Sequence, residues 1–409
     1  MKKLLIIFLF LSSYTLFSEE KGLAKINNID LWWESYGDKR DPPVLLIMGL
    51  NANCKYWDQE FIDEIVQNSF YVITFDNRDV GKSTWFGEEP FVMKLLQFMP
   101  SFVIEYLVNT MIDLTLDEKG GFRMNESSSE AVEYDLADMA LDTVGLLDYL
   151  DINKAHVVGV SMGGMIAQVL ALDHADRILT LVPMMTTPGF DTAGLPGPSK
   201  SFMEAMKKSF ILNLDGRSED SSVLIQMAQS GSRFPPKENE VRAKVRRIDS
   251  HGNNLYNLQT AAVGASPNRL NRLKEIKVST LVIHGSEDPL VPLEHGLAIA
   301  EQIEGLGNCK SCSTGSFSSM SIVTYLSGSL CLSSVRKALR IQRRSPRSPI
   351  ATSIESSNVV GIKAWEGSWL LSGLIAGSFP DLLGRAGMKP ILLGTIALRS
   401  RLVHAGVLK

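Results

Sequence analysis

The sequence predicts an α/β fold with a mainly parallel sheet that is flanked by helices. Short, continuous apolar runs recur between residues 43 and 283, and amphipathic helical patterns separate several of them. Short runs rich in β-branched residues are typical of strands buried on both faces of a parallel sheet. Their alternation with helices indicates successive βαβ units.

The predicted elements follow one another along the first three quarters of the chain. An antiparallel strand at residues 29–36 is expected to begin the sheet. The further strands are expected at residues 43–48, 71–75, 155–160, 177–182 and 279–283, and the helices at residues 135–150 and 162–172.

Two segments interrupt this series. Residues 91–116 are strongly apolar and helical in pattern, although Pro100 breaks the pattern. Three interpretations stay open for them: a lid over an apolar substrate pocket, a membrane-surface helix, or a helical hairpin packed on the core. Residues 190–273 are more polar and helical in places, which is typical of an inserted cap.

The chain is therefore expected to form a core in two parts, with a cap between them. The core covers residues 25–188, which include a helical insertion at 86–118, and residues 274–305; the cap or lid covers 189–273. Residues 306–409 differ in composition, with 13 Lys and Arg against 3 Asp and Glu, although the whole chain has a net charge of −4. So different a tail should not be read as part of the same domain.

The first 18 residues resemble a signal peptide. Lys2 and Lys3 precede an apolar run at residues 4–11, and small residues end near Ser18. The run is too short to span a bilayer, so cleavage and a secreted or periplasmic location are expected, with a retained anchor or a buried helix as the alternatives. Cys54 is the only cysteine before residue 309, so no disulfide is expected within the core.

Ser161 lies in the pattern Gly-Val-Ser-Met-Gly at residues 159–163. An apolar strand pattern precedes it and a helical pattern follows it, which is the strand–turn–helix context of a nucleophilic serine. Gly159 and Gly163 allow the chain to bend sharply there. The amino end of the following helix stabilises negative charge. We therefore expect Ser161 to be a nucleophile.

Two backbone N–H groups are candidates for an oxyanion hole. Gly49 follows the strand at residues 43–48 and permits a close approach to the reacting group, with Leu50 as the expected donor. The N–H of Met162, directly after the nucleophile, is the expected second donor.

The polar loop at residues 76–83 follows the next strand. Its Gly-Lys-Ser ending suggests a phosphate-binding loop, but Asp76 occupies the position where that motif needs a glycine. We therefore expect a structural role, in which Arg78 joins loops beneath the site by charge-assisted hydrogen bonds. No nucleotide or nucleic-acid partner is predicted, and the chemistry of the serine needs neither cofactor nor metal.

Asp288 follows the strand predicted at residues 279–283, in the sequence His-Gly-Ser-Glu-Asp-Pro. An acid after the nucleophile, at the end of a later strand, can hold a histidine in its working tautomer and stabilise the imidazolium. Glu287 is the competing acid.

With these motifs in place, residues from about 25 to 305 resemble the α/β-hydrolase superfamily. The nearest resemblance is to its small esterases, lipases and methylesterases, with Met-Gly at residues 48–49 where many members have His-Gly. The resemblance implies an α/β-hydrolase fold, Ser161 as nucleophile, Asp288 as the triad acid, and Leu50 and Met162 as oxyanion donors. It also implies a histidine after one more strand, in a Gly-rich turn.

That histidine is missing from the expected window. Residues 309–318 contain none, and His404 is far too late to fit the pattern. The resemblance ends in mid-fold near Gly305, just before the last expected strand. We interpret residues 306–409 as a frameshifted or displaced reading of the gene, with a natural low-complexity tail as the alternative. Translation of the other two frames after codon 305 tests this.

Two functions remain at this point. The first is a serine hydrolase that acts on carboxylic esters, with acyl or lipid esters as one substrate class that the apolar insertions suggest. Cofactor-free haloperoxidase and C–C hydrolase chemistry are variants of the same triad. The second is a catalytically inactive hydrolase-like protein that acts as a binding scaffold or is a failed gene product. A small-molecule ester is the expected partner, and membrane-surface association is the second expectation. The sequence predicts no oligomeric state.

Overall fold

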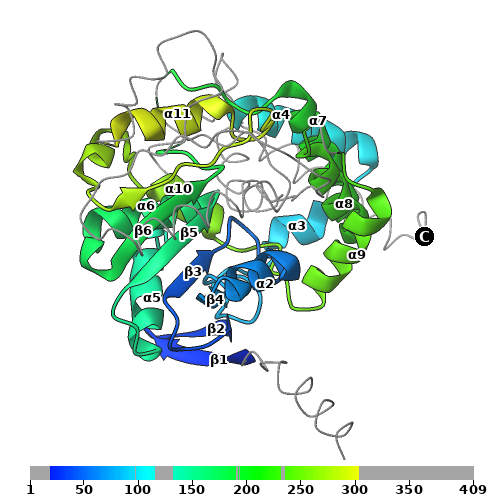
Figure 1. Cartoon of the computed structure of the whole chain (residues 1–409). Coiled ribbons are helices and arrows are strands. Elements are labelled where there is room, and N and C mark those ends of the chain that lie inside the picture. Colours follow the sequence, from blue (N-terminus) through cyan, green and yellow to red (C-terminus); the bar gives the residue numbers. More distant parts are fainter. Residues whose placement is uncertain are drawn as a thin grey trace, which may run out of the picture.

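The computed structural model describes residues 19–96, 98–115, 132–189, 192, 194–231 and 235–303. A seven-stranded sheet runs through them in the order β1-β2-β4-β3-β5-β6-β7 (Figure 1). The strands are β1 (Glu19–Ile26), β2 (Ile29–Tyr36), β3 (Pro43–Ile47), β4 (Tyr71–Phe75), β5 (Ala155–Val160), β6 (Ile178–Met184) and β7 (Ser279–Thr280).

The first two strands pair antiparallel with their neighbours, and all the later pairs are parallel. This confirms the predicted mainly parallel sheet with an antiparallel start. The strand β1 was not predicted, so the sheet begins at Glu19 rather than near residue 25. Asn27 and Asn28 form the two-residue turn between β1 and β2, and both have a positive φ, of 45° and 64°. Asparagine tolerates this conformation, which suits the twist of a tight hairpin.

Helices cover both faces of the sheet (Figure 1). On one face, α5 (Leu136–Tyr149) and α6 (Met162–Asp173) pack on strand residues such as Leu45 and Val157. On the other face, α2 (Gln59–Gln67) packs on the alternate residues, such as Leu46. Side chains alternate between the two faces of a strand, so each strand contributes to both cores.

The remaining helices lie outside these two layers. They are α3 (Phe91–Leu96), α4 (Ser101–Thr115), α7 (Lys200–Leu214), α8 (Ser218–Ala228), α9 (Glu238–Asp249), α10 (Gln259–Ala265) and α11 (Leu293–Gln302), with 3₁₀ turns η1 (Cys54–Tyr56), η3 (Ala175–Arg177) and η4 (Leu270–Glu275). The segment from α7 to η4 lies between β6 and β7 in sequence. Pro100 separates α3 from α4, as the sequence predicted.

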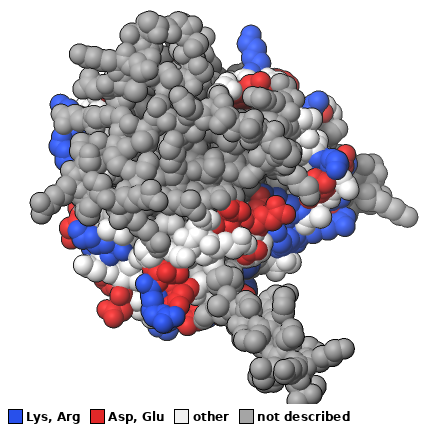
Figure 2. All heavy atoms as spheres, viewed as in Figure 1, with Lys and Arg blue, Asp and Glu red and all other residues white. Residues whose placement is uncertain are grey.

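Charged side chains of both signs are interspersed on the described surface (Figure 2). The helices α8 and α9 carry the densest group: Arg242 pairs with Glu219 at 3.0 Å and with Asp220 at 2.9 Å. Arg246 pairs with the same Glu219 at 3.0 Å. These ion pairs link α8 to α9 at the surface.

The far edge of the sheet is shorter than predicted. The strand β7 has two residues, Ser279 and Thr280, and an isolated bridge between Met184 and Ile283 continues the alignment. No strand lies beyond β7 among the described residues. The predicted signal peptide (1–18) and the tail (306–409) lie outside the described residues. Within the part of the chain that the structure describes, no helix combines the length and apolarity needed to cross a membrane.

Candidate active site

Ser161 occupies the sharp turn between β5 and α6. Its backbone has φ +53° and ψ −119°, a strained conformation for a residue that is not glycine. Three hydrogen bonds hold the peptide carbonyl of Ser161: the N–H groups of Gly164 and Met165 donate to it, and so does the hydroxyl of Thr186 at 2.7 Å. The surrounding structure therefore enforces a turn that presents the serine at the carboxyl end of the sheet.

The turn can form only because glycines surround it. A Cβ on Gly163 would lie 2.2 Å from the carbonyl oxygen of Ile47, and a Cβ on Gly159 would lie 2.2 Å from that of Gly163. A Cβ on Gly49 would lie 3.1 Å from the Cβ of Ser161. The turn after β3 is thus in direct contact with the proposed nucleophile.

The two predicted oxyanion donors lie on these two turns. Strands β3 and β5 are neighbours, with Ile47 opposite Gly159, so Leu50 and Met162 follow adjacent strand ends. Within the described residues, neither the Leu50 N–H nor the Met162 N–H has a hydrogen-bond partner. Two free N–H groups beside a serine are what an oxyanion hole requires.

The loop at residues 76–83 supports this arrangement from below. Asn77 donates to the carbonyl oxygen of Met48 at 3.0 Å. Arg78 makes a buried, bidentate ion pair with Asp142 of α5, with N–O distances of 2.6 and 2.7 Å. Asp79 is fully buried and accepts five hydrogen bonds from neighbouring segments. The predicted structural role of the loop, with Arg78 tying elements together, is confirmed.

Asp288 lies in the loop after β7, so it follows the carboxyl end of a parallel strand, as Ser161 does. One of its carboxyl oxygens accepts the N–H groups of Leu290 and Val291, at 3.0 and 2.9 Å. Burial raises its pKa to about 7, against the opposing effect of these two donors. Glu287 is exposed, and its carboxyl lies against Gly231 instead. Asp288 is thus the buried acid of this pair.

None of the described histidines is hydrogen-bonded to Ser161. Nε2 of His284 lies 3.8 Å from Oδ2 of Asp288, but it donates to a backbone carbonyl at 2.7 Å. Burial lowers the pKa of His284 and of His295. The partners are Thr180 for His156, Asp76 for His251, Val291 for His284, and Thr187 and Pro196 for His295. His404 lies outside the described residues.

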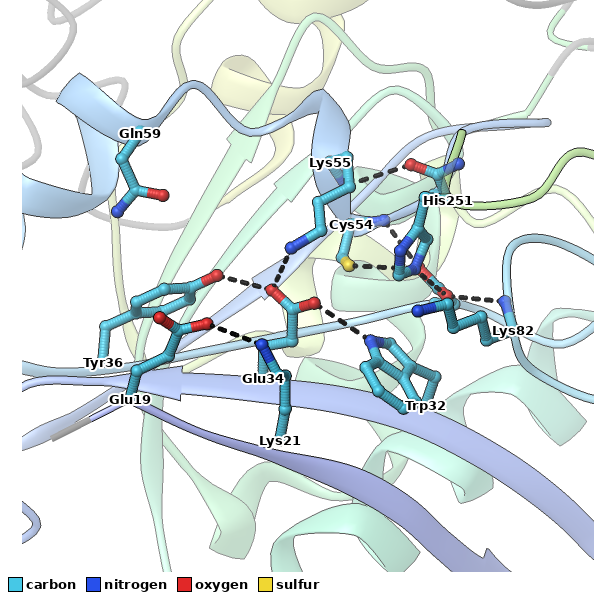
Figure 3. Close-up of polar contacts among 12 residues, drawn as sticks. Glu19, Lys21, Trp32, Glu34, Tyr36, Cys54, Lys55, Gln59, Lys82 and His251 are labelled. Carbon is cyan, nitrogen blue, oxygen red and sulfur yellow. Dashed lines mark hydrogen bonds and ion pairs between the residues drawn. The ribbon is translucent and has the colours of Figure 1, made fainter. Parts of the chain in front are cut away.

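A second polar cluster gathers side chains from β2, from η1 and from the turn after α9 (Figure 3). Glu34, Cys54 and His251 bring one potential metal ligand each within 4.8 Å of one another. The ammonium of Lys55, however, already pairs with the carboxylate of Glu34 at 2.5 Å. Burial and the charge of Asp76 raise the pKa of the Cys54 thiol, which disfavours the thiolate that a metal needs. As built, this site holds an ammonium group rather than a metal ion.

The same cluster connects the core to the segment between β6 and β7. Burial raises the pKa of Glu34, but hydrogen bonds from Lys55, Tyr36 and Trp32 outweigh it and keep that pKa low. Nε2 of His251, which follows α9, lies 2.8 Å from the buried carboxylate of Asp76. The sequence placed His251 in the cap. Its contact with a residue 175 positions away has no sequence signal.

Sequence reasoning also missed Asn51 and Gln259. The carboxamide of Gln259, in α10, accepts a hydrogen bond from the backbone N–H of Asn51 at 2.7 Å. Asn51 directly follows Leu50, so its place in the motif could have marked it as part of the site. No sequence feature marked Gln259, because 208 residues separate the two partners.

Comparison with known proteins agrees with this architecture. The chain is 26% identical over 301 residues to the rhodomycin D methylesterase DauP of Streptomyces sp. (strain C5), which covers 68% of this chain and 86% of that protein. It is 33% identical over 172 residues to a 2-hydroxy-6-oxo-6-phenylhexa-2,4-dienoate hydrolase of Comamonas testosteroni, covering 41% and 56%. Among solved structures, it is similar to the enol-lactonase of Burkholderia xenovorans LB400, with a TM-score of 0.49 and 19% identity over 69% of this chain and 88% of that one. The family model of the alpha/beta hydrolase fold matches residues 42–312, and the chain belongs to this family.

Proposed function

We propose that this chain is a carboxylic ester hydrolase with Ser161 as its nucleophile. The observation that carries the proposal is the enforced left-handed backbone of Ser161, with the Gly49 turn packed against it. A serine needs such a turn to expose its hydroxyl above the sheet. The two free N–H groups of Leu50 and Met162 lie on the turns that meet there.

The reaction then proceeds through an acyl-enzyme. The hydroxyl oxygen of Ser161 attacks the ester carbonyl carbon while a histidine takes its proton, and the N–H groups of Leu50 and Met162 stabilise the oxyanion. The histidine returns the proton to the departing alkoxide, which leaves as the alcohol. Water, deprotonated by the same histidine, then releases the acid and restores the serine. Asp288 would orient that histidine.

Whether the chain hydrolyses esters depends on which histidine, if any, accepts the proton of Ser161. Every described histidine is placed away from Ser161 or is engaged elsewhere, so His404 is the one candidate outside the described residues. The raised pKa of Asp288 is also what a triad acid shows when no imidazolium lies beside it. These observations favour a second candidate function, a hydrolase-like binding protein without turnover.

Labelling with a fluorophosphonate probe tests the proposal. We expect the full chain to be labelled and Ser161→Ala to remain unlabelled. Hydrolysis of p-nitrophenyl butyrate should depend on Ser161 in the same way. Absence of labelling in a folded sample would reject the ester hydrolase and favour the binding protein.

Two further variants locate the base. If His404 supplies it, His404→Ala abolishes turnover. If no histidine of the chain does, added imidazole should raise Ser161-dependent turnover, after subtraction of the rate measured with Ser161→Ala. Assays with an enol-lactone, a vinylogous diketone and a halide-plus-peroxyacid mixture separate ester hydrolysis from the related C–C hydrolase and haloperoxidase reactions.

We also propose that the chain is exported. The apolar run at residues 4–11 supports this, and β1 begins at Glu19, directly after the predicted cleavage region. Expression in a Gram-negative host should yield periplasmic protein whose mass lacks the first residues. Phe8→Asp should retain the uncleaved chain in the cytoplasm, and unchanged export of that variant would contradict the proposal.

The aromatic residues around α4 support a third proposal, that the chain associates with a lipid surface. Phe98, Phe102 and Tyr106 are spaced four residues apart and are 69%, 71% and 65% exposed. The segment 91–110 has one basic and one acidic residue, so we expect binding to neutral phosphatidylcholine vesicles without a need for anionic lipid. Replacing all three aromatic residues by Ser should abolish cosedimentation. The matched control replaces the exposed Leu141 and Tyr149 of α5.

A further inference from the structure

The turn that carries Leu50 is held from outside the core. Its backbone closes with a hydrogen bond from Ala52 N–H to the Gly49 carbonyl at 3.3 Å. Asn51 has a φ of +58°, a left-handed backbone conformation that asparagine tolerates. The N–H of Asn51 donates to Oε1 of Gln259 at 2.7 Å. The amide N–H of Leu50 has no hydrogen-bond partner among the described residues.

Gln259 joins this turn to the buried ion pair below it. Its Nε2 donates to the carbonyl oxygen of Arg78 at 2.8 Å, while the Arg78 guanidinium is fixed by Asp142. A backbone N–H needs the amide oxygen and a backbone carbonyl needs the amide NH₂, so the two contacts define one orientation of the carboxamide. Gln259 is fully buried. Each end of this side chain meets a group that would otherwise be buried without a partner.

Gln259 does not belong to the core that bears the nucleophile. It is the first residue of α10, in the segment between β6 and β7. Its own N–H donates to the side chain of Asn257 at 3.2 Å, which fixes the start of the helix. A shift of α10 would therefore be transmitted to the Leu50 turn through one side chain.

We propose that Gln259 is a positioning residue that sets the oxyanion hole. By engaging the Asn51 N–H, it fixes the peptide between Leu50 and Asn51 and leaves the Leu50 N–H as the donor that faces Ser161. The proposal rests on the proposed function, because it assigns the Leu50 N–H to an oxyanion. It adds that the segment between β6 and β7 controls the geometry of the hole.

The test compares two substitutions with a matched control. Gln259→Met has a similar shape but forms neither hydrogen bond. Gln259→Glu keeps the acceptor for Asn51, and it regains the donor to Arg78 only when its carboxyl is protonated. Gln226→Met removes another fully buried glutamine, in α8, which makes no hydrogen bond to the turn among the described residues.

Fluorophosphonate labelling of Ser161 gives the kinetic readout. Removal of an oxyanion donor costs about 100-fold or more in rate, so a displaced donor should cost about 10-fold or more. We expect Gln259→Met to lower the maximal labelling rate by that factor at an unchanged half-saturating probe concentration, and Gln226→Met to leave both unchanged. The rate of Gln259→Glu relative to the original chain should rise as the pH falls from 8 to 5.5. An unchanged maximal rate in Gln259→Met overturns the proposal.

Hydrogen exchange separates this proposal from the proposed function. In Gln259→Met, the peptide covering residues 48–54 should exchange faster while β3 stays protected. If the original chain is not labelled at all, the ester hydrolase fails, and this exchange result still decides whether Gln259 fixes the turn. Unchanged exchange in that peptide overturns the positioning role in either case.

Discussion

Ser161 and Asp288 both follow parallel strands of one sheet, yet the chain holds them in different ways. The strand β5 has six residues and pairs with β3 on one side and β6 on the other. The strand β7 has two residues and pairs, in the described part of the chain, with β6 alone. Ser161 therefore follows a strand in the middle of the sheet, and Asp288 follows the strand at its described edge.

The two regions also differ in how their charged and polar groups are paired. Around Ser161, glycines and backbone hydrogen bonds fix a strained turn, and a buried Arg78–Asp142 pair braces the loop beneath it. Around Asp288, the carboxyl meets two N–H groups of its own loop, and burial raises its pKa to about 7. Ser161 and its two candidate oxyanion donors lie within residues 43–186, whereas the carboxyl of Asp288 has no cationic partner among the described residues.

The largest effect should come from breaking the ion pair on the nucleophile side. Asp142→Ala leaves the Arg78 guanidinium buried without its partner, which typically costs ~3–5 kcal/mol in the free energy of unfolding. Asp148→Asn is the matched control, because its pair with Arg177 is exposed on the carboxylate side and should contribute less than about 1 kcal/mol. Urea denaturation measures both. Equal losses in the free energy of unfolding would show that the buried Arg78–Asp142 pair contributes no more to stability than the exposed pair.

A smaller effect is expected from overfilling the serine turn. In Gly163→Ala the new methyl group would meet the Ile47 carbonyl, and such overpacking costs ~1–3 kcal/mol as the backbone shifts. Labelling of Ser161 should fall at the same time, since Gly163 lies inside the turn. In the control Gly22→Ala on β1, the nearest atom would be 3.6 Å away, so the melting temperature should hardly change. If Gly163→Ala were labelled as fast as the original chain, the turn would have room for a Cβ at this position, contrary to the packing described above.

The sequence predicted the region around Ser161 far better than the region around Asp288. Strands β4 and β5 begin and end where their apolar runs do, because strands in the middle of a parallel sheet are buried on both faces. The last predicted strand, at residues 279–283, is reduced to two residues. The apolar pattern indicates which residues are buried, but it does not show whether a segment is paired along its whole length.

Contacts between distant segments were the other limit. The motif around Ser161 is local, so residue types and spacing were sufficient to predict its turn and both oxyanion donors as candidates. The bond from Asn51 to Gln259 and that from Asp76 to His251 join residues about 200 positions apart. Gln259 and His251 are ordinary polar residues in the segment between β6 and β7, and they acquire a role only through the fold.

The smallest effect, and the sharpest test of the acid region, is the pH dependence that Asp288 imposes on stability. Its pKa is near the usual 3.8 when unfolded and about 7 when folded, so between those values the folded chain holds a proton that the unfolded chain lacks. The free energy of unfolding should therefore fall as the pH rises from 4 to 7. One pKa unit corresponds to about 1.4 kcal/mol, and we expect a total on the order of 1–2 kcal/mol because the side chain keeps some contact with water.

Asp288→Asn isolates this contribution, because the amide oxygen still accepts the N–H groups of Leu290 and Val291 but cannot ionise. His284 and His295 also titrate in this window and act in the opposite direction, since burial lowers their pKa. The measurement is therefore the urea midpoint of Asp288→Asn minus the urea midpoint of the original chain, determined from pH 4.5 to 8. It should grow in favour of Asp288→Asn as the pH rises. A flat difference for Asp288→Asn would mean that the carboxyl already ionises freely, as it would beside a cationic histidine contributed by the rest of the chain.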